Sequence, residues 1–306
     1  MNHRNRPIPI LIATLTLAAP ALAAGDERLE RPFTVEFSVG AEYDSNVAVL
    51  ELDTSSGEGD TAALIDFGLG FDKDVTEWLE IKLGYNLSQT LHDNFDAFDL
   101  RIHRGSGELA FDLGGVDAGL GYQHADAALD GNGFLVLKRT APYLGRLFKE
   151  TLFLRLEYAA TDKEFDSDPA RDASADAWSL DGFVFVDGVK HYWIFGYQSQ
   201  DEDAAEDEFD YTGSRLKLQY VRRLGGNQRI KLKTGLRYET RDYDAPQLVL
   251  GGPRQDDRRG FEAELEWPVK KRGYLRTRYE YNDNESNLTS VDFDEQVVSV
   301  ELGWKF

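Results

Sequence analysis

Three groups of side chains in this sequence could do chemistry, and the first is an acidic run near the middle of the chain. Carboxylate oxygens are the ligands that Ca²⁺ prefers in proteins. The run lacks the glycine-punctuated Asp-x-Asp-x-Asp spacing with a closing Glu that builds a calcium loop, and such runs are usually solvated. We therefore predict no metal centre but retain a candidate cation-binding loop formed by Asp201, Glu202, Asp203, Glu206, Asp207 and Glu208.

The second group consists of two histidines that lie close to aspartates. His92 precedes Asp93, and His124 lies shortly before Asp126. A His–Asp pair can orient a general base, but the sequence has no nucleophile elbow, no metal-ligand spacing and no phosphate-binding loop. We therefore predict that the protein is not an enzyme, has no catalytic residues and needs no cofactor.

The third group consists of charged residues that recur at every second position, as on one face of a β-strand. Rows of opposite sign fall on neighbouring segments. They could create a transverse field across a pore that selects polar solutes, or form cross-strand ion pairs that stiffen a wet wall, which we favour. The candidate lumen-lining residues are Glu36, Glu42, Asp66, Glu80, Lys82, Arg155, Glu157, Arg215, Lys217, Lys231, Lys233, Arg237, Glu262, Glu264, Arg276, Arg278 and Glu301.

Composition limits the elements that can position these groups. The chain has 306 residues, a formal charge of −21 and no cysteine, which leaves no disulfide framework. The acidic excess argues against nucleic acid as a partner, because a phosphate-binding surface needs clustered Lys and Arg. Residues 1–23 have the basic start, short apolar centre and small-residue end of a signal peptide, and residues 24–32 follow as a short periplasmic lead.

Alternating apolar and polar residues predict about fourteen strands. The clearest is Phe33–Tyr43, and short turns alternate with long polar connections such as residues 44–60 and 239–259. This asymmetry and an even strand number are typical of outer-membrane barrels. The sequence predicts an all-β, transmembrane, antiparallel up-and-down β-barrel over residues 33–306, with short periplasmic turns and long extracellular loops. One strand is weakened by Pro142, which removes a ladder donor, and we assign its apolar face to Leu135, Leu137, Ala141 and Tyr143.

The last strand, Phe293–Phe306, supports a membrane location. Its apolar face ends in Trp304 and Phe306, where a membrane strand carries its interfacial aromatic residues. We predict that these two residues form an assembly signal and that the strand pairs with Phe33–Tyr43 to close the barrel. The expected location is the outer membrane of a Gram-negative bacterium, in contact with lipid, lipopolysaccharide and the barrel assembly machinery.

Two short segments carry a family resemblance. Gly40-Ala41-Glu42-Tyr43-Asp44-Ser45-Asn46-Val47 and Tyr279-Glu280-Tyr281-Asn282-Asp283-Asn284-Glu285-Ser286-Asn287 resemble the opening and closing segments of surface lipoprotein assembly modifier barrels. The resemblance implies a barrel of about fourteen strands that translocates lipoproteins. Members of that family carry a helical repeat domain ahead of the barrel, whereas here about ten residues separate the predicted signal from the first strand, so we expect the barrel part only.

Three functions remain open from the sequence. The leading hypothesis is a passive channel or translocation pore for polar solutes or exported cargo. The second is the barrel component of a lipoprotein or exopolysaccharide export system that works with a separate periplasmic partner. The third is a structural or adhesive barrel whose acidic loops bind cations.

Overall fold

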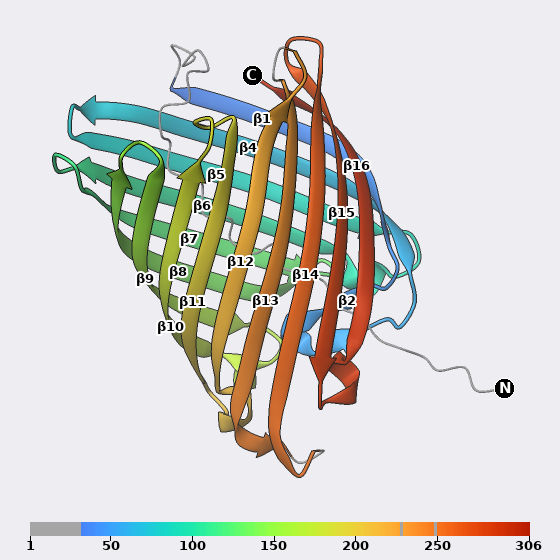
Figure 1. Cartoon of the computed structure of the whole chain (residues 1–306). Coiled ribbons are helices and arrows are strands. Elements are labelled where there is room, and N and C mark those ends of the chain that lie inside the picture. The colour runs from blue at the N-terminus through green and yellow to red at the C-terminus, as the bar shows by residue number, and fades with distance from the viewer. Residues whose placement is uncertain (1–31, 227–228, 248–249) are drawn as a thin grey trace.

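The computed structural model describes residues 32–226, 229–247 and 250–306, so the predicted signal peptide and nearly all of the predicted lead lie outside the described residues. Fourteen strands form one closed barrel in which each strand pairs with its neighbour in the chain (Figure 1). Among the described residues, no helix is long and apolar enough to cross a membrane. The strands of the barrel are β1 Phe33–Asp44, β4 Asp60–Thr76, β5 Leu79–His92, β6 Leu100–Asp112, β7 Asp117–Leu129, β8 Asn132–Phe148, β9 Leu152–Phe165, β10 Ala173–Phe185, β11 His191–Ala204, β12 Tyr211–Leu224, β13 Ile230–Gln247, β14 Gly252–Val269, β15 Gly273–Ser286 and β16 Phe293–Lys305.

The barrel closes where β1 pairs antiparallel with β16, as the sequence predicts. The register places Phe37 opposite Trp304 and Val39 opposite Leu302, and the rings of Phe37 and Trp304 stack with centroids 6.5 Å apart. Backbone hydrogen bonds between Val35 and Phe306 extend this ladder to the last residue of the chain. The apolar side chains of the two terminal strands therefore share one face across the closure.

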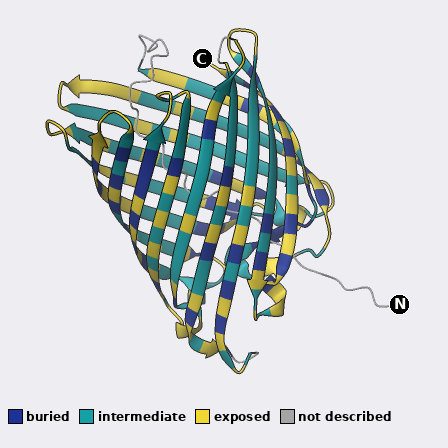
Figure 2. Ribbon diagram, in the orientation of Figure 1, coloured by how far each residue is buried: buried dark blue, intermediate teal, exposed yellow. Residues whose placement is uncertain are grey.

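Each strand presents an apolar face outward and a mostly polar face inward. Outward-facing Trp178 and Leu180 are 57% and 49% exposed, whereas the alternate residues Ser179 and Asp181 are buried. Figure 2 shows this alternation of exposed and buried positions along the strands. The strands of the wall pair with one another around the closed sheet, so an apolar exterior suits it to a lipid environment.

Strand β8 departs from the predicted facing. Its register places Tyr143 opposite Glu157, and Tyr143 donates a hydrogen bond to Glu108 on the inner face. Leu135, Leu137 and Ala141 alternate in step with Tyr143 and therefore also face inward, which contradicts their assignment to the lipid-facing side. Pro142 lies outward at a local gap in the β8–β9 ladder, as expected for a residue without an N–H.

The two rims of the barrel carry different connections. The rim that holds the end of β16 has short turns such as residues 77–78, and we call it the periplasmic rim. The opposite, extracellular rim begins with a long connection, residues 45–59, but residues 130–131 and 248–251 are short. The predicted loop 239–259 is therefore wrong, because β13 and β14 continue as paired strands through most of it.

Residues 45–59, which we call the first connecting segment, fold into the barrel. They form a small hairpin of β2 (Ala48–Val49) and β3 (Thr54–Ser55) around a turn of 3₁₀-helix, η1 (Leu50–Leu52). In Figure 1 this blue segment lies within the ring of strands, toward the end of the barrel opposite the C-terminus. The residues were expected to be a solvent-exposed loop, whereas Val47, Ala48 and Val49 are almost completely buried.

Burial of these apolar residues holds the first connecting segment against the inner wall. Val49, 2% exposed, packs in one cluster with apolar side chains from four strands, and Leu52 packs against the same cluster. Fully burying a valine contributes roughly 1.5–3 kcal/mol relative to leaving it in water. The wall residues of the cluster are Leu100, Ile102, Ala127, Phe134, Leu135 and Phe165.

Candidate functional site

The first connecting segment is also tied across the lumen by ion pairs. Asp53 contacts two arginines from different parts of the wall, Arg171 at 2.8 Å and Arg254 at 3.0 Å. Arg171 lies in η3 (Pro169–Arg171), between β9 and β10, and also donates a hydrogen bond to the backbone oxygen of Glu51. Arg254 lies at the start of β14 and is 0% exposed. The Asp53 carboxylate therefore links the segment to two sides of the extracellular mouth.

A row of arginines continues along β14 from this contact. Arg254 makes a two-point contact with Asp256 at 2.8 Å for each pair of atoms, and Arg258 reaches Asp256 at 3.2 Å. Such two-point arginine–carboxylate contacts are among the strongest ion pairs in proteins because two parallel N–H···O bonds form at once. Arg254 is therefore held by the wall and by the first connecting segment together.

Glu239 on β13 is surrounded by arginines of three strands. Its carboxylate contacts Arg215 at 2.7 Å, Arg241 at 2.8 Å and Arg258 at 3.9 Å. The Nε atoms of Arg237 and Arg258 are buried without a hydrogen-bond partner among the described residues. One carboxylate therefore faces several guanidinium groups, which leaves this part of the wall with excess positive charge.

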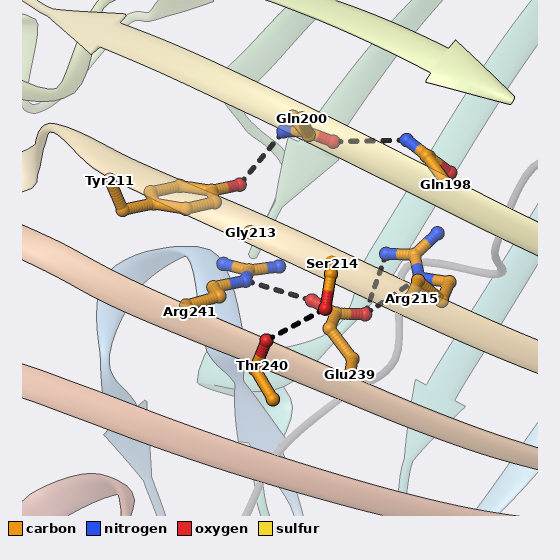
Figure 3. Close-up of a pocket in the computed structure, with 9 residues that line it drawn as sticks. All are labelled: Gln198, Gln200, Tyr211, Gly213, Ser214, Arg215, Glu239, Thr240 and Arg241. Atoms are coloured by element: carbon orange, nitrogen blue, oxygen red, sulfur yellow. Dashed lines mark hydrogen bonds and ion pairs between the residues drawn. The ribbon is translucent and has the colours of Figure 1, made fainter.

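These arginines border a hollow in the inner wall between β11, β12 and β13. Figure 3 shows Arg215 and Arg241 on either side of Glu239, while Gln198, Gln200 and Tyr211 line the remaining side. Gly213 lies in the wall of the hollow, where the strands pack closely: a Cβ there would come within 3.1 Å of the Thr240 carbonyl oxygen. We call this the arginine hollow, and its lining residues are Gln198, Gln200, Tyr211, Gly213, Ser214, Arg215, Glu239, Thr240 and Arg241.

Glu51 of the first connecting segment faces the same basic wall. Burial raises the pKa of its carboxyl, while the positive charges of Arg241, Lys163 and Arg258 oppose that shift. Its Oε2 atom is buried and has no hydrogen-bond partner among the described residues. The segment therefore brings a second carboxyl group, besides that of Asp53, toward the arginines of the wall.

The predicted lumen-lining residues all occupy inward positions of their strands, and many form ion pairs there. Lys233 contacts Glu262 at 3.2 Å, and Arg276 contacts both Glu266 at 3.1 Å and Glu301 at 3.6 Å. The cross-strand pairs of the favoured interpretation are thus present. That these residues line an open pore, or create a transverse field in one, stays a prediction.

The predicted cation-binding loop is not a loop over its first half. Asp201, Glu202 and Asp203 belong to β11, and Asp207 and Glu208 lie in η4 (Asp207–Phe209). Glu202 faces inward, where it pairs with Lys163 at 2.6 Å and accepts a hydrogen bond from the Tyr211 hydroxyl. Its neighbours along the strand alternate to the outer face, so the run does not converge. Within the described ranges, no group of three acidic or histidine side chains could hold a metal ion.

The two histidine pairs also do not converge. His92 contacts Asp99, with 3.4 Å between Nδ1 and Oδ1, rather than its sequence neighbour Asp93. His124 lies in the middle of β7, opposite Lys138 of β8. The structure therefore gives no geometric reason to join either histidine to a catalytic group.

The proposed assembly signal lies at the periplasmic rim. Trp304 stacks on Phe37, and the guanidinium group of Arg272 lies 5.3 Å from the centre of the Phe306 ring. Both aromatic residues thus lie at the end of the closing strand, at the rim of the barrel. Their role in assembly stays a prediction.

Sequence reasoning missed the contacts of Asp53 with Arg171 and Arg254. The available signal was the apolar run from Val47 to Leu52, which interrupts an otherwise polar connection. An extracellular loop has no reason to expose such a run to water, so it indicated burial against something. The partner arginines could not be identified, because they are far from Asp53 in the sequence.

Comparisons with known proteins bear on this architecture. The family model described as surface lipoprotein assembly modifier matches residues 146–306, which is more than half of the chain. No curated protein matches the sequence. Among solved structures, an anion-selective porin from Comamonas acidovorans is similar with a TM-score of 0.53 and 11% identity, covering 90% of this chain and 98% of the porin.

A second similar structure is the outer-membrane expressed OmpT of Vibrio cholerae, with a TM-score of 0.53 and 9% identity. The alignment covers 90% of this chain and 98% of that protein. At such identities the likeness concerns the fold alone. It agrees with an outer-membrane β-barrel in a Gram-negative bacterium.

Proposed function

Because this chain belongs to the surface lipoprotein assembly modifier family, we propose that its barrel is a translocation pore of the outer membrane whose extracellular mouth is kept narrow by the first connecting segment. The proposal assigns the inner face to polar solutes or exported cargo and requires no catalytic step. Passage would need the segment to move away from the wall, while the fourteen strands stay in place.

The observation that carries this proposal is the contact of Asp53 with Arg171 and Arg254. It joins a segment that lies inside the barrel to two parts of the wall, and it uses charges rather than a continuous sheet. Ion pairs of this kind can exchange partners with water or cargo, whereas a paired strand cannot leave the wall without losing its ladder. The apolar contacts of Val49 keep the segment closed when no cargo is present.

Conductance through a planar lipid bilayer tests the proposal. We expect the purified full-length barrel to give small stepwise currents, and we expect a variant lacking residues 47–57 to give larger ones. Heat-modifiable migration on a gel shows that both proteins are folded. A folded but electrically silent deletion variant would contradict the pore function.

The family membership favours a second candidate, in which the pore works with a separate periplasmic partner to move lipoproteins to the cell surface. The test is surface display of lipoproteins in cells that lack the gene, measured by protease accessibility on intact cells. Reduced display, restored by the wild-type gene, would support this candidate. Unchanged display would restrict the proposal to polar solutes.

A further inference from the structure

The arginine hollow has the properties of a binding site rather than of a plain ion-pair ladder. The guanidinium groups of Arg215 and Arg241 face the hollow, and both contact Glu239. The amides of Gln198 and Gln200 and the hydroxyl of Tyr211 already donate hydrogen bonds within the wall, to Gln200 and Glu202. The three arginines around Glu239 nevertheless outnumber the carboxylates that they contact, because Arg258 is the one that also reaches Asp256.

Gly213 lies on the inward face between Tyr211 and Arg215, and a Cβ at this position would meet the Tyr211 ring at 3.3 Å, so glycine keeps this part of the wall open. The hollow opens toward the lumen, and its free space of about 10 Å³ holds one oxygen-sized group. One oxygen of an oxyanion would therefore fit, while the rest of the ligand stays in the lumen. Figure 3 shows the polar groups on both sides of this glycine, with Arg241 across from Gln200.

A second observation points to an anion. Arg258 borders the same cluster, is 6% exposed, and its Nε atom has no hydrogen-bond partner among the described residues. The first connecting segment places two carboxyl groups near these arginines. Asp53 contacts Arg254, and Glu51 lies within the electrostatic influence of Arg241. Acidic groups of the chain itself thus lie beside the arginines that would contact an oxyanion.

We propose that the arginine hollow binds the carboxylate or phosphate groups of an anionic ligand entering the pore, in competition with the acidic side chains of the first connecting segment. Arginine suits this role because its planar fork of N–H donors matches the geometry of both oxyanions. An anion bound there would compete with the contacts between the wall and the first connecting segment. The segment would then leave the wall more readily, which would open the pore for the ligand. The inference deepens the proposed function and rests on it only for this last step.

Isothermal titration of the detergent-folded full-length barrel with inorganic pyrophosphate, at constant ionic strength, tests the site directly. We expect saturable binding to the wild type and at least about tenfold weaker binding to Arg215→Gln and Arg241→Gln, since a charge-assisted hydrogen bond contributes roughly 1.5–3 kcal/mol. Lys190→Gln, an equal loss of charge in an exposed periplasmic turn, should bind as the wild type does.

Two more measurements keep the test decisive. Asp53→Asn leaves the wall intact and frees the segment, so this variant should bind pyrophosphate more tightly than the wild type. Equal affinity of the wild type, Asp53→Asn and Arg241→Gln for pyrophosphate would overturn the inference. A parallel titration with hexaglutamate distinguishes an acidic chain from a small phosphate as the ligand, and saturable binding of either supports the site. Conducting barrels that bind neither anion would refute the inference alone, whereas silent barrels that bind one would refute only the pore function.

Discussion

Replacing Asp53 with asparagine should release the first connecting segment from the wall without disturbing the barrel. Asparagine keeps the size of the side chain but removes the charge that contacts Arg171 at 2.8 Å and Arg254 at 3.0 Å. Asp53 accepts one charge-assisted hydrogen bond, from Arg171, and such a bond contributes roughly 1.5–3 kcal/mol. The contact with Arg254 is an ion pair without a hydrogen bond, and both arginines retain another carboxylate, Asp168 or Asp256. We therefore expect a loss of about 1.5–3 kcal/mol in the free energy that holds the segment closed.

This loss has a measurable size. Since 1.4 kcal/mol is a factor of ten, the ratio of closed to open segment should fall by about 10-fold to 150-fold. Hydrogen exchange reports it directly, because the amides of Val47 and Ser56 form the hairpin bonds of the segment, to the backbone oxygens of Glu58 and Val47. Their exchange should accelerate by that factor, while amides of the barrel strands remain protected. In bilayers the same variant should spend more time at its larger conductance.

The matched control is Asp130→Asn, which removes one charge from an exposed position on the same rim. Asp130 has a φ of 49°, and asparagine tolerates this conformation well. The control should leave exchange of the Val47 and Ser56 amides unchanged. If Asp53→Asn behaves like this control, the ion pairs do not hold the segment and the gating argument fails.

Three further outcomes are expected. Deleting Phe306, or adding a polar tail after it, should lower the membrane yield of folded barrel far more than a comparable change in residues 130–131, measured by heat-modifiable migration; equal yields would count against an assembly signal. Val49→Ala should loosen the first connecting segment by about 1–3 kcal/mol, seen as faster proteolysis within it, because the removed methyl groups leave a gap in a packed cluster. Burial raises the pKa of Glu51, although the charges of Arg241, Lys163 and Arg258 oppose this shift. The closed segment therefore binds the proton of Glu51 more tightly than the open segment does. Closure is strongest at low pH and weakens as the pH rises toward the raised pKa. Conductance should therefore increase with pH, and Glu51→Gln should remove that dependence.

The barrel could be predicted from the sequence because lipid imposes a rule that each strand obeys separately. Alternation at a period of two is local, so Phe33–Tyr43 and Phe293–Phe306 were predicted as strands, and their pairing was confirmed by the register. The exception, β8, is instructive. Tyr143 and Leu135 are apolar enough for lipid, yet both face inward, one hydrogen-bonded to Glu108 and the other packed with the first connecting segment. An apolar side chain does not report its face where the interior also holds an apolar cluster.

Connections were harder to predict, because polarity alone does not separate a loop from a strand that continues beyond the membrane. Residues 200–204 and most of residues 239–259 are polar, so they lack the apolar–polar alternation of a membrane-facing strand. Backbone pairing nevertheless continues, with Arg241 opposite Asp256 and Glu202 opposite Tyr211. The sequence patterns of a solvated strand and a loop are the same there, and only the ladder distinguishes them.

The residues of the candidate site lie on a strand extension and on a connection, the two kinds of segment that were hard to predict. In our proposal, their charges serve both closure of the mouth and binding of an anion. Arg254 and Arg258 lie on a part of β14 whose polar sequence predicts a loop. Asp53 lies on a connection whose polar sequence predicts a loop as well. A wall built only for rigidity would balance each arginine with a neighbouring carboxylate, as Arg276 is balanced by Glu266 and Glu301. Beside this cluster the first connecting segment adds a carboxylate that belongs to none of the barrel strands, because Asp53 contacts Arg254. A charge that is neutralised by a movable partner becomes available whenever that partner leaves, so closure of the mouth and recognition of an anion follow from one arrangement.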